Sequence, residues 1–172
     1  TIMSNAVRHR IRLLVAIASY GTANDRHLSR LIAEYRSMPY STHIVVLSNI
    51  PRDLGRDVEV AVGLPTRDPW SLPFGHKRIF VDRINDYDLF IYSENDTLIT
   101  QRNVEAFLRM SALLPDNEVA GFLRFEKDTN GNVFFPDVHW NYHWDSQSVR
   151  VMGNYTFAFF SNEHAACYVL TR

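Results

Sequence analysis

A short apolar run that ends in acidic residues constrains this chain more than any other segment. Residues 88–96 read Asp-Leu-Phe-Ile-Tyr-Ser-Glu-Asn-Asp. An apolar run of this length is typical of a strand that is buried on both faces of a sheet. The acids that follow it, Glu94 and Asp96, are therefore expected at the carboxyl edge of the sheet, where open α/β sheets bind their ligands.

Strand and helix patterns alternate along the first hundred residues. Apolar runs predict strands at 11–18, 43–47 and 58–62, before the acidic strand. Apolar residues at helical spacing predict a helix that Asn24 or Asp25 caps and that continues to Met38. A second helix is expected over 76–85. This order predicts an α/β fold with a mixed, mostly parallel central sheet flanked by helices.

The second half of the chain carries weaker patterns. We expect a helix over 101–114, strands over 119–125 and 155–160, a hairpin turn at Asn130-Gly131-Asn132, and a short terminal helix capped by Asn162. The chain has no repeat, low-complexity run or linker. We therefore expect a single domain over residues 1–172.

Composition narrows the class of protein. The formal net charge is -1. Because a dedicated nucleic-acid binder usually carries a basic excess, we expect no nucleic-acid partner. No apolar run approaches the roughly 20 residues that cross a bilayer, and no secretory signal precedes Arg12. We therefore expect a cytoplasmic protein without a membrane span. The single cysteine, Cys167, excludes an internal disulfide and is expected to be a buried structural thiol.

The spacing of Glu94 and Asp96 suits a metal ion. Residues two apart in an extended strand point the same way, so both carboxylates can face one cation. Mg²⁺ in phosphate-handling sites is bound by one or two carboxylates together with substrate phosphates. The alternative is a solvated turn, because Asn-Asp-Thr is common turn chemistry.

Basic residues open the helix that leads into the acidic strand. His76-Lys77-Arg78 stands at its expected N-terminus, where positive side chains oppose the helix dipole. A bound anion such as a diphosphate would relieve this conflict. The alternative is an exposed basic turn.

Together these elements resemble the donor site of GT-A fold glycosyltransferases. The resemblance is carried by the segment "LPFGHKRIFVDRINDYDLFIYSENDTLIT", with Glu94-Asn95-Asp96 as a DxD-like motif, and by the first strand "LLVAIASY". It implies transfer of a sugar from a UDP- or GDP-sugar to a hydroxyl of a carbohydrate or other acceptor, assisted by Mn²⁺ or Mg²⁺. It also implies a nucleotide-binding half over about 11–100 and an acceptor-side half, compact or truncated, over about 101–172.

The resemblance also assigns residues to roles. Asp96 is implied as the main metal ligand, with Glu94 nearer the ribose or a metal-bound water. The residues implied at the nucleotide and its diphosphate are Ala18, Ser19, Tyr20, Ser48, Asn49, Lys77, Arg78 and Asn95.

An aromatic stretch at 139–145 is the candidate sugar-binding loop, since aromatic faces bind the apolar patches of sugar rings. An inverting transferase needs a carboxylate base at the acceptor hydroxyl, and Asp145 and Asp137 are the candidates. The alternative is that the tryptophans pack on the sheet while the acids face solvent.

Other functions remain as alternatives. A non-catalytic nucleotide-sugar or carbohydrate-binding module would keep the fold and lose turnover. A nucleotidyltransferase would share the sheet and the metal, but its glycine-rich loop is reduced here to Gly21. A P-loop protein is excluded because the chain lacks the G-x-x-x-x-G-K-[ST] pattern.

Overall fold

Alternate side chains of the first strand enter two different cores, and this sets the layers of the fold. The computed structural model describes residues 10–135, 144–160 and 166–172. Strand β1 (Arg12–Ser19) is buried along almost its whole length. From residue 13 to residue 18, odd-numbered side chains belong to one core and even-numbered side chains to the other. A strand without a polar face requires a cover on both sides.

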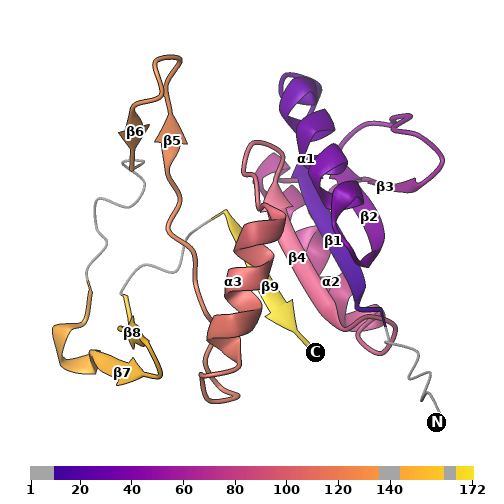
Figure 1. Ribbon diagram of the computed structural model, residues 1–172. Coiled ribbons are helices and arrows are strands. Elements are labelled where there is room, and N and C mark those ends of the chain that lie inside the picture. The colour runs from indigo at the N-terminus through magenta and orange to yellow at the C-terminus, as the bar shows by residue number, and fades with distance from the viewer. Residues whose placement is uncertain (1–9, 136–143, 161–165) are drawn as a thin grey trace, which may run out of the picture.

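Five strands form the central sheet in the order β3-β2-β1-β4-β9 (Figure 1). The other four strands are β2 (Ser41–Ser48), β3 (Val58–Val62), β4 (Leu89–Glu94) and β9 (Cys167–Thr171). The first four strands in the chain are parallel, and β9 is antiparallel to β4. The prediction of an α/β fold with a mixed, mostly parallel sheet is confirmed.

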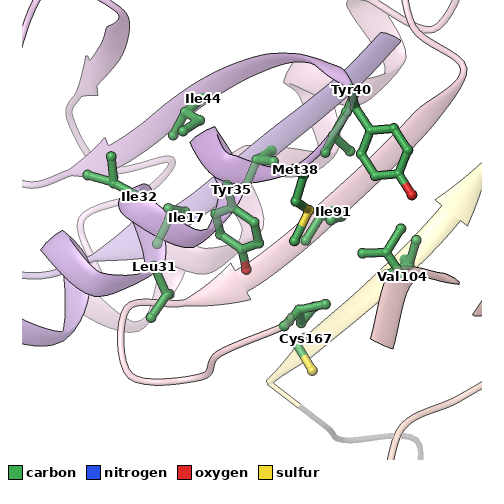
Figure 2. Close-up of a cluster of buried hydrophobic side chains, with 14 of the residues drawn as sticks. Ile17, Leu31, Ile32, Tyr35, Met38, Tyr40, Ile44, Ile91, Val104 and Cys167 are labelled. Carbon is green, nitrogen blue, oxygen red and sulfur yellow. The ribbon is translucent and has the colours of Figure 1, made fainter. Parts of the chain in front are cut away.

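Helices cover both faces of this sheet. The helices α1 (Asp25–Ser37) and α3 (Gln101–Ser111) pack on one face, where Tyr35 and Val104 are fully buried against β1 and β4 (Figure 2). The 3₁₀ helix η1 (Pro69–Phe74) and α2 (Gly75–Asp82) cover the other face. The sequence predicted α1, α2 and α3, and the helical spacing of their apolar residues explains why each buries one apolar face against the sheet.

Two small sheets lie beyond β9, away from β1 to β3 (Figure 1). They pair β5 (Glu126–Lys127) with β6 (Val133–Phe134), and β7 (Arg150–Met152) with β8 (Tyr155–Phe157), after the short 3₁₀ helix η3 (Ser146–Ser148). The predicted hairpin turn between β5 and β6 is confirmed. The carboxylate of Asp128 holds it by accepting hydrogen bonds from the backbone of Asn130 and Asn132 at 2.8 and 2.9 Å.

In the second half, the strand predicted over 119–125 and the terminal helix are wrong, and the strand predicted over 155–160 is confirmed only in part. Residues 119–125 alternate between exposed and half-buried side chains, as a strand does, but they form no strand because no ladder pairs their backbone. The strand expected over 155–160 is only β8, which joins β7 and not the central sheet. In place of a terminal helix the chain ends in β9, whose side chains at Cys167 and Val169 point into the core.

Antiparallel pairing explains this last difference. Without β9 one edge of β4 would leave its backbone groups unpaired beside a buried face. Asn162, the predicted cap, lies outside the described residues. Cys167 is buried as predicted, and burial raises the pKa of its thiol to about 11.

Among the described residues, the helices all lack either the length or the apolar character that crossing a membrane requires.

The residue before β9 adopts an unusual backbone conformation. Ala166 has φ +52°, and its carbonyl accepts a hydrogen bond from the backbone N–H of Glu94 at 3.0 Å. An L-residue in this left-handed region costs about 1–2 kcal/mol. We expect Ala166→Gly to raise the free energy of unfolding by about 0.5 kcal/mol and Ala166→Val to lower it by more than about 1 kcal/mol, measured by urea denaturation.

Ala112 is the matched control for this substitution. It has φ -64° at the end of α3, so Ala112→Gly should lower stability by about 0.5–1 kcal/mol. Equal losses for the two glycine variants would contradict a strained Ala166.

Candidate functional site

The strand order places a topological switch point at the carboxyl ends of β1 and β4. From β1 the chain moves outward to β2 and β3, then crosses back to add β4 on the other side of β1. The connections after β1 and β4 lead to α1 and α3 on the same face of the sheet, and the carboxyl edge at such a change in strand order is where open α/β sheets bind ligands. Ser19 and Tyr20 lie on one side of this switch point, at the end of β1, and the turn from Glu94 to Asp96 lies on the other, at the end of β4.

Asn95 joins the two sides. Its side-chain amide donates a hydrogen bond to Ser19 Oγ at 3.0 Å, and its backbone N–H donates to the carbonyl of Ala18 at 3.0 Å. Its own Oδ1 accepts a hydrogen bond from Asn24 Nδ2 at 3.1 Å. Asn95 is buried, so it fixes the acidic turn against β1. The side chain of Asn24 is thereby engaged and does not cap α1 as predicted.

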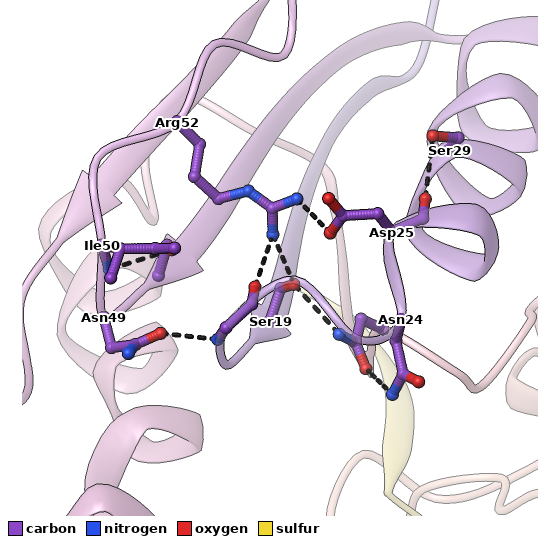
Figure 3. Close-up of polar contacts among 10 residues, drawn as sticks. Ser19, Asn24, Asp25, Ser29, Asn49, Ile50 and Arg52 are labelled. Atoms are coloured by element: carbon purple, nitrogen blue, oxygen red, sulfur yellow. Dashed lines mark hydrogen bonds and ion pairs between the residues drawn. The ribbon is translucent and has the colours of Figure 1, made fainter.

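Arg52 extends this network to the loop after β2 (Figure 3). Its Nη1 donates to Ser19 Oγ at 3.0 Å and to the carbonyl of Gly21 at 3.1 Å, and its Nη2 pairs with the carboxylate of Asp25. The side chain is only 7% exposed. The sequence prediction missed Arg52, because a single arginine after Pro51 carries no local pattern that separates it from a solvated one.

The residues predicted beside the nucleotide base after β2 also hold loops together. Asn49 Oδ1 accepts a hydrogen bond from the backbone N–H of Gly21 at 2.7 Å, and Ser48 Oγ accepts one from Ile50 at 3.3 Å. Gly21 has φ +61°, which favours glycine and lets the loop after β1 turn sharply toward Asn49. The structure therefore brings Ala18, Ser19 and Asn49 together with Asn95.

The two acids of the triplet differ in exposure. Asp96 is exposed, and its Oδ1 accepts a hydrogen bond from Thr97 Oγ1 at 3.3 Å. Glu94 is half-buried. Within residues 10–135, 144–160 and 166–172, no three His, Cys, Asp or Glu side chains gather in a way that could hold a metal ion. The strand alternation that was predicted to aim both carboxylates the same way does not reach Asp96, because β4 ends at Glu94 and a turn follows, in which the backbone N–H of Thr97 donates to the carbonyl of Glu94 at 3.1 Å.

The three basic residues predicted at the start of α2 differ in burial: His76 is buried, and Lys77 and Arg78 are exposed. His76 is buried and stacks on Tyr92 with ring centroids 4.0 Å apart, and its two ring nitrogens contact Tyr168 Oη and the Pro73 carbonyl. Burial lowers the pKa of His76 and raises the pKa of Tyr168 to about 12. His76 is therefore part of the core and not an anion ligand.

Lys77 and Arg78 remain exposed, and their contacts are local. The ammonium of Lys77 lies 5.1 Å from the ring centroid of Phe74, and Arg78 pairs with Asp82 one turn later at 3.4 Å. The start of α2 lies against the end of β2. A Cβ added at Gly75 would be 3.4 Å from a methyl group of Leu47.

The predicted catalytic bases lie in the second half. Asp145 is exposed, and its carboxylate caps η3 by accepting a hydrogen bond from the backbone of Gln147 at 2.9 Å. Asp137 and residues 139–143 of the aromatic stretch lie outside the described residues.

Two comparisons with known proteins were negative. A scan against protein-family models finds no match for the chain, and a search of curated proteins finds none either.

The first prediction for this site concerns Arg52. Arg52→Met removes three contacts that connect the loops after β1 and β2 with α1. We expect the free energy of unfolding to fall by about 2–3 kcal/mol, since hydrogen bonds to charged groups contribute about 1.5–3 kcal/mol. Urea denaturation measures this loss. The exposed Arg56, four residues later, is the control, and Arg56→Met should change stability by less than about 0.5 kcal/mol. Equal effects would contradict the linking role.

The second prediction concerns pH. The pKa of His76 is lowered in the folded protein, so the unfolded chain binds its proton first, near pH 6.5. The stabilisation from neutral His76 is therefore complete above this pH and is lost as the pH falls below it. We expect the drop in unfolding free energy between pH 7.5 and pH 5.5 to be smaller in His76→Gln than in the parent. The exposed His27 on α1 gives the control, since His27→Gln should leave the drop unchanged.

Proposed function

We propose that this protein is a glycosyltransferase of GT-A fold that transfers a sugar from a nucleotide-diphosphate donor to an acceptor hydroxyl, with Mn²⁺ or Mg²⁺. The observation that supports this best is the contrast within the acidic turn. Asn95 is buried and bonded to Ser19, while its neighbour Asp96 is left exposed at the switch point. A rigid turn that presents a carboxylate is what a metal–diphosphate site requires.

The loop after β1 is suited to the nucleoside. Tyr20 is 54% exposed beside Ser19, although the residues around it are tied down by Arg52 and Asn49. An exposed aromatic ring on a fixed loop can stack on a base without further ordering. This supports the role proposed for Tyr20 in donor binding.

The start of α2 supports a diphosphate at the same edge. Lys77 and Arg78 are exposed near the carboxyl end of β2, where the helix begins. Their charges attract an anionic group, and the N-terminus of α2 favours the same sign of ligand.

The proposed chemistry divides between the two halves. The acceptor oxygen forms the new glycosidic bond as the bond between the sugar and the diphosphate breaks, and the hydroxyl proton passes to a carboxylate base. A cation bound by Asp96 would stabilise the charge that develops on the departing diphosphate. Asp145 and Asp137 remain the predicted bases.

One observation favours a second candidate, a non-catalytic module that binds a nucleotide sugar. The carboxylate of Asp145 is engaged as the cap of η3 and is exposed to solvent. A protein with no free base at the acceptor would bind the donor without transferring the sugar. Release of UDP or GDP in the presence of an acceptor distinguishes the two.

Asp96→Asn tests the metal site. The amide keeps the shape of the side chain and removes its charge. In the presence of Mn²⁺ we expect the Kd for UDP or GDP to rise at least about tenfold, while binding without metal stays unchanged. Isothermal titration calorimetry measures both constants.

The exposed Asp116, in the loop after α3, provides the matched control. Asp116→Asn should bind the nucleotide as the parent does. If Asp96→Asn also binds as the parent does with Mn²⁺, the proposed metal–diphosphate site is wrong.

A further inference from the structure

An open cavity of about 510 Å³ lies beside β9, away from the switch point between β1 and β4. Its walls come from the extended segment 118–122, the residues 157–160 that include the end of β8, and β9 itself. We propose that this cavity binds the apolar part of an acceptor, a small molecule that carries a hydroxyl on a hydrocarbon or aromatic body. This assignment rests on the proposed transferase function.

Most of the wall is apolar. The apolar residues that line the cavity include Leu114, Ala120, Phe122, Phe157, Ala158 and Leu170. A volume of about 510 Å³ lies in the range of about 300–1,000 Å³ that is usual for small-molecule sites. An apolar body of that size gains free energy when it leaves water for such a wall.

The absence of a side chain at Gly121 lets the ring of Phe160 pack closely against the backbone in one wall of the cavity. A Cβ at this position would stand 2.8 Å from Phe160 Cζ, so the aromatic ring lies directly against the glycine backbone. Phe160 is also edge-on to Trp144, with ring centroids 5.2 Å apart. These contacts hold the ring of Phe160 in place as a rigid side of the cavity.

The polar part of the wall includes an ion pair. Arg150 pairs with Glu118, and its guanidinium lies 5.4 Å from the ring centroid of Phe159. The Glu118 side chain is 14% exposed and that of Arg150 is 36% exposed. The pair offers a donor and an acceptor side by side. A hydroxyl can accept from the guanidinium and donate to the carboxylate at once, so the pair suits a neutral hydroxylated molecule better than an anion or a cation.

The cavity is connected to the proposed transfer site through β9. Cys167 lines the cavity and pairs in register with Ser93, the residue before Glu94. The next residue back along the chain, Ala166, accepts the hydrogen bond from the Glu94 backbone. A molecule in the cavity is thus held beside the strand end that carries the acidic turn.

Octyl β-glucoside, below its micelle concentration, is the probe, with methyl β-glucoside as the analogue without the apolar tail. Calorimetry is done on the full chain without nucleotide or metal. We expect the octyl compound to bind at least about tenfold more tightly than the methyl compound, because only the octyl chain fills the cavity. Equal affinities would overturn the proposal.

Two phenylalanine variants locate the binding. Ala158→Phe fills the cavity and should weaken octyl glucoside at least about tenfold, whereas Val151→Phe adds the same ring at a 72% exposed position outside the wall and should not. If Ala158→Phe fails to fold by circular dichroism, Ala158→Leu replaces it, with the same direction expected. Undiminished binding in a folded Ala158 variant would assign the detergent to the exposed apolar surface and overturn the proposal.

The readout separates this inference from the function on which it rests. Octyl glucoside binding requires neither Asp96 nor a nucleotide. If octyl glucoside binds through its tail but neither UDP nor GDP binds, the proposed transferase function is wrong. The acceptor role of the cavity, which rests on that function, is then wrong as well. Nucleotide binding without tail-dependent binding would overturn only the cavity assignment.

Discussion

The hydroxyl of Ser19 connects the three loops on which the proposed site depends. It is fully buried at the end of β1 and accepts hydrogen bonds from Arg52 after β2 and from Asn95 after β4, both at 3.0 Å. A hydroxyl oxygen has two lone pairs, so both bonds are satisfied at one atom. Because β1 is the central strand, these bonds fix the loops on each side of the switch point relative to the sheet.

Within a few residues of one another, some polar side chains are buried and hold the loops together while others are exposed. The buried polar groups are used inside the protein, where an unsatisfied group would be costly. The exposed groups, Asp96 and Tyr20, are those proposed to bind the metal and the nucleotide base. The same separation occurs at the start of α2, where His76 joins an aromatic cluster with Tyr92 and Lys77 faces solvent. Neighbours in the sequence therefore have opposite roles.

The elements that the sequence predicted well are those whose pattern reflects burial on a central sheet. Continuous apolar runs identified β1, β2 and β4, and helical spacing identified α1 and α3. Predictions failed where structure depends on pairing with a distant segment. Residues 119–125 alternate as a strand would, and only backbone pairing decides whether they become one. The end of the chain forms β9 because the edge of β4 accepts it.

The sequence by itself determined the α/β architecture and the position of an acidic turn after a buried strand, since both follow from local periodicity. The tertiary structure alone decided which polar residues hold that turn. Arg52 lies 33 positions from Ser19, and Asn95 lies 76 positions from it, yet all three meet at one hydroxyl. Hydrogen bonds act over about 3 Å, so contacts between such distant residues exist only after the strands have paired.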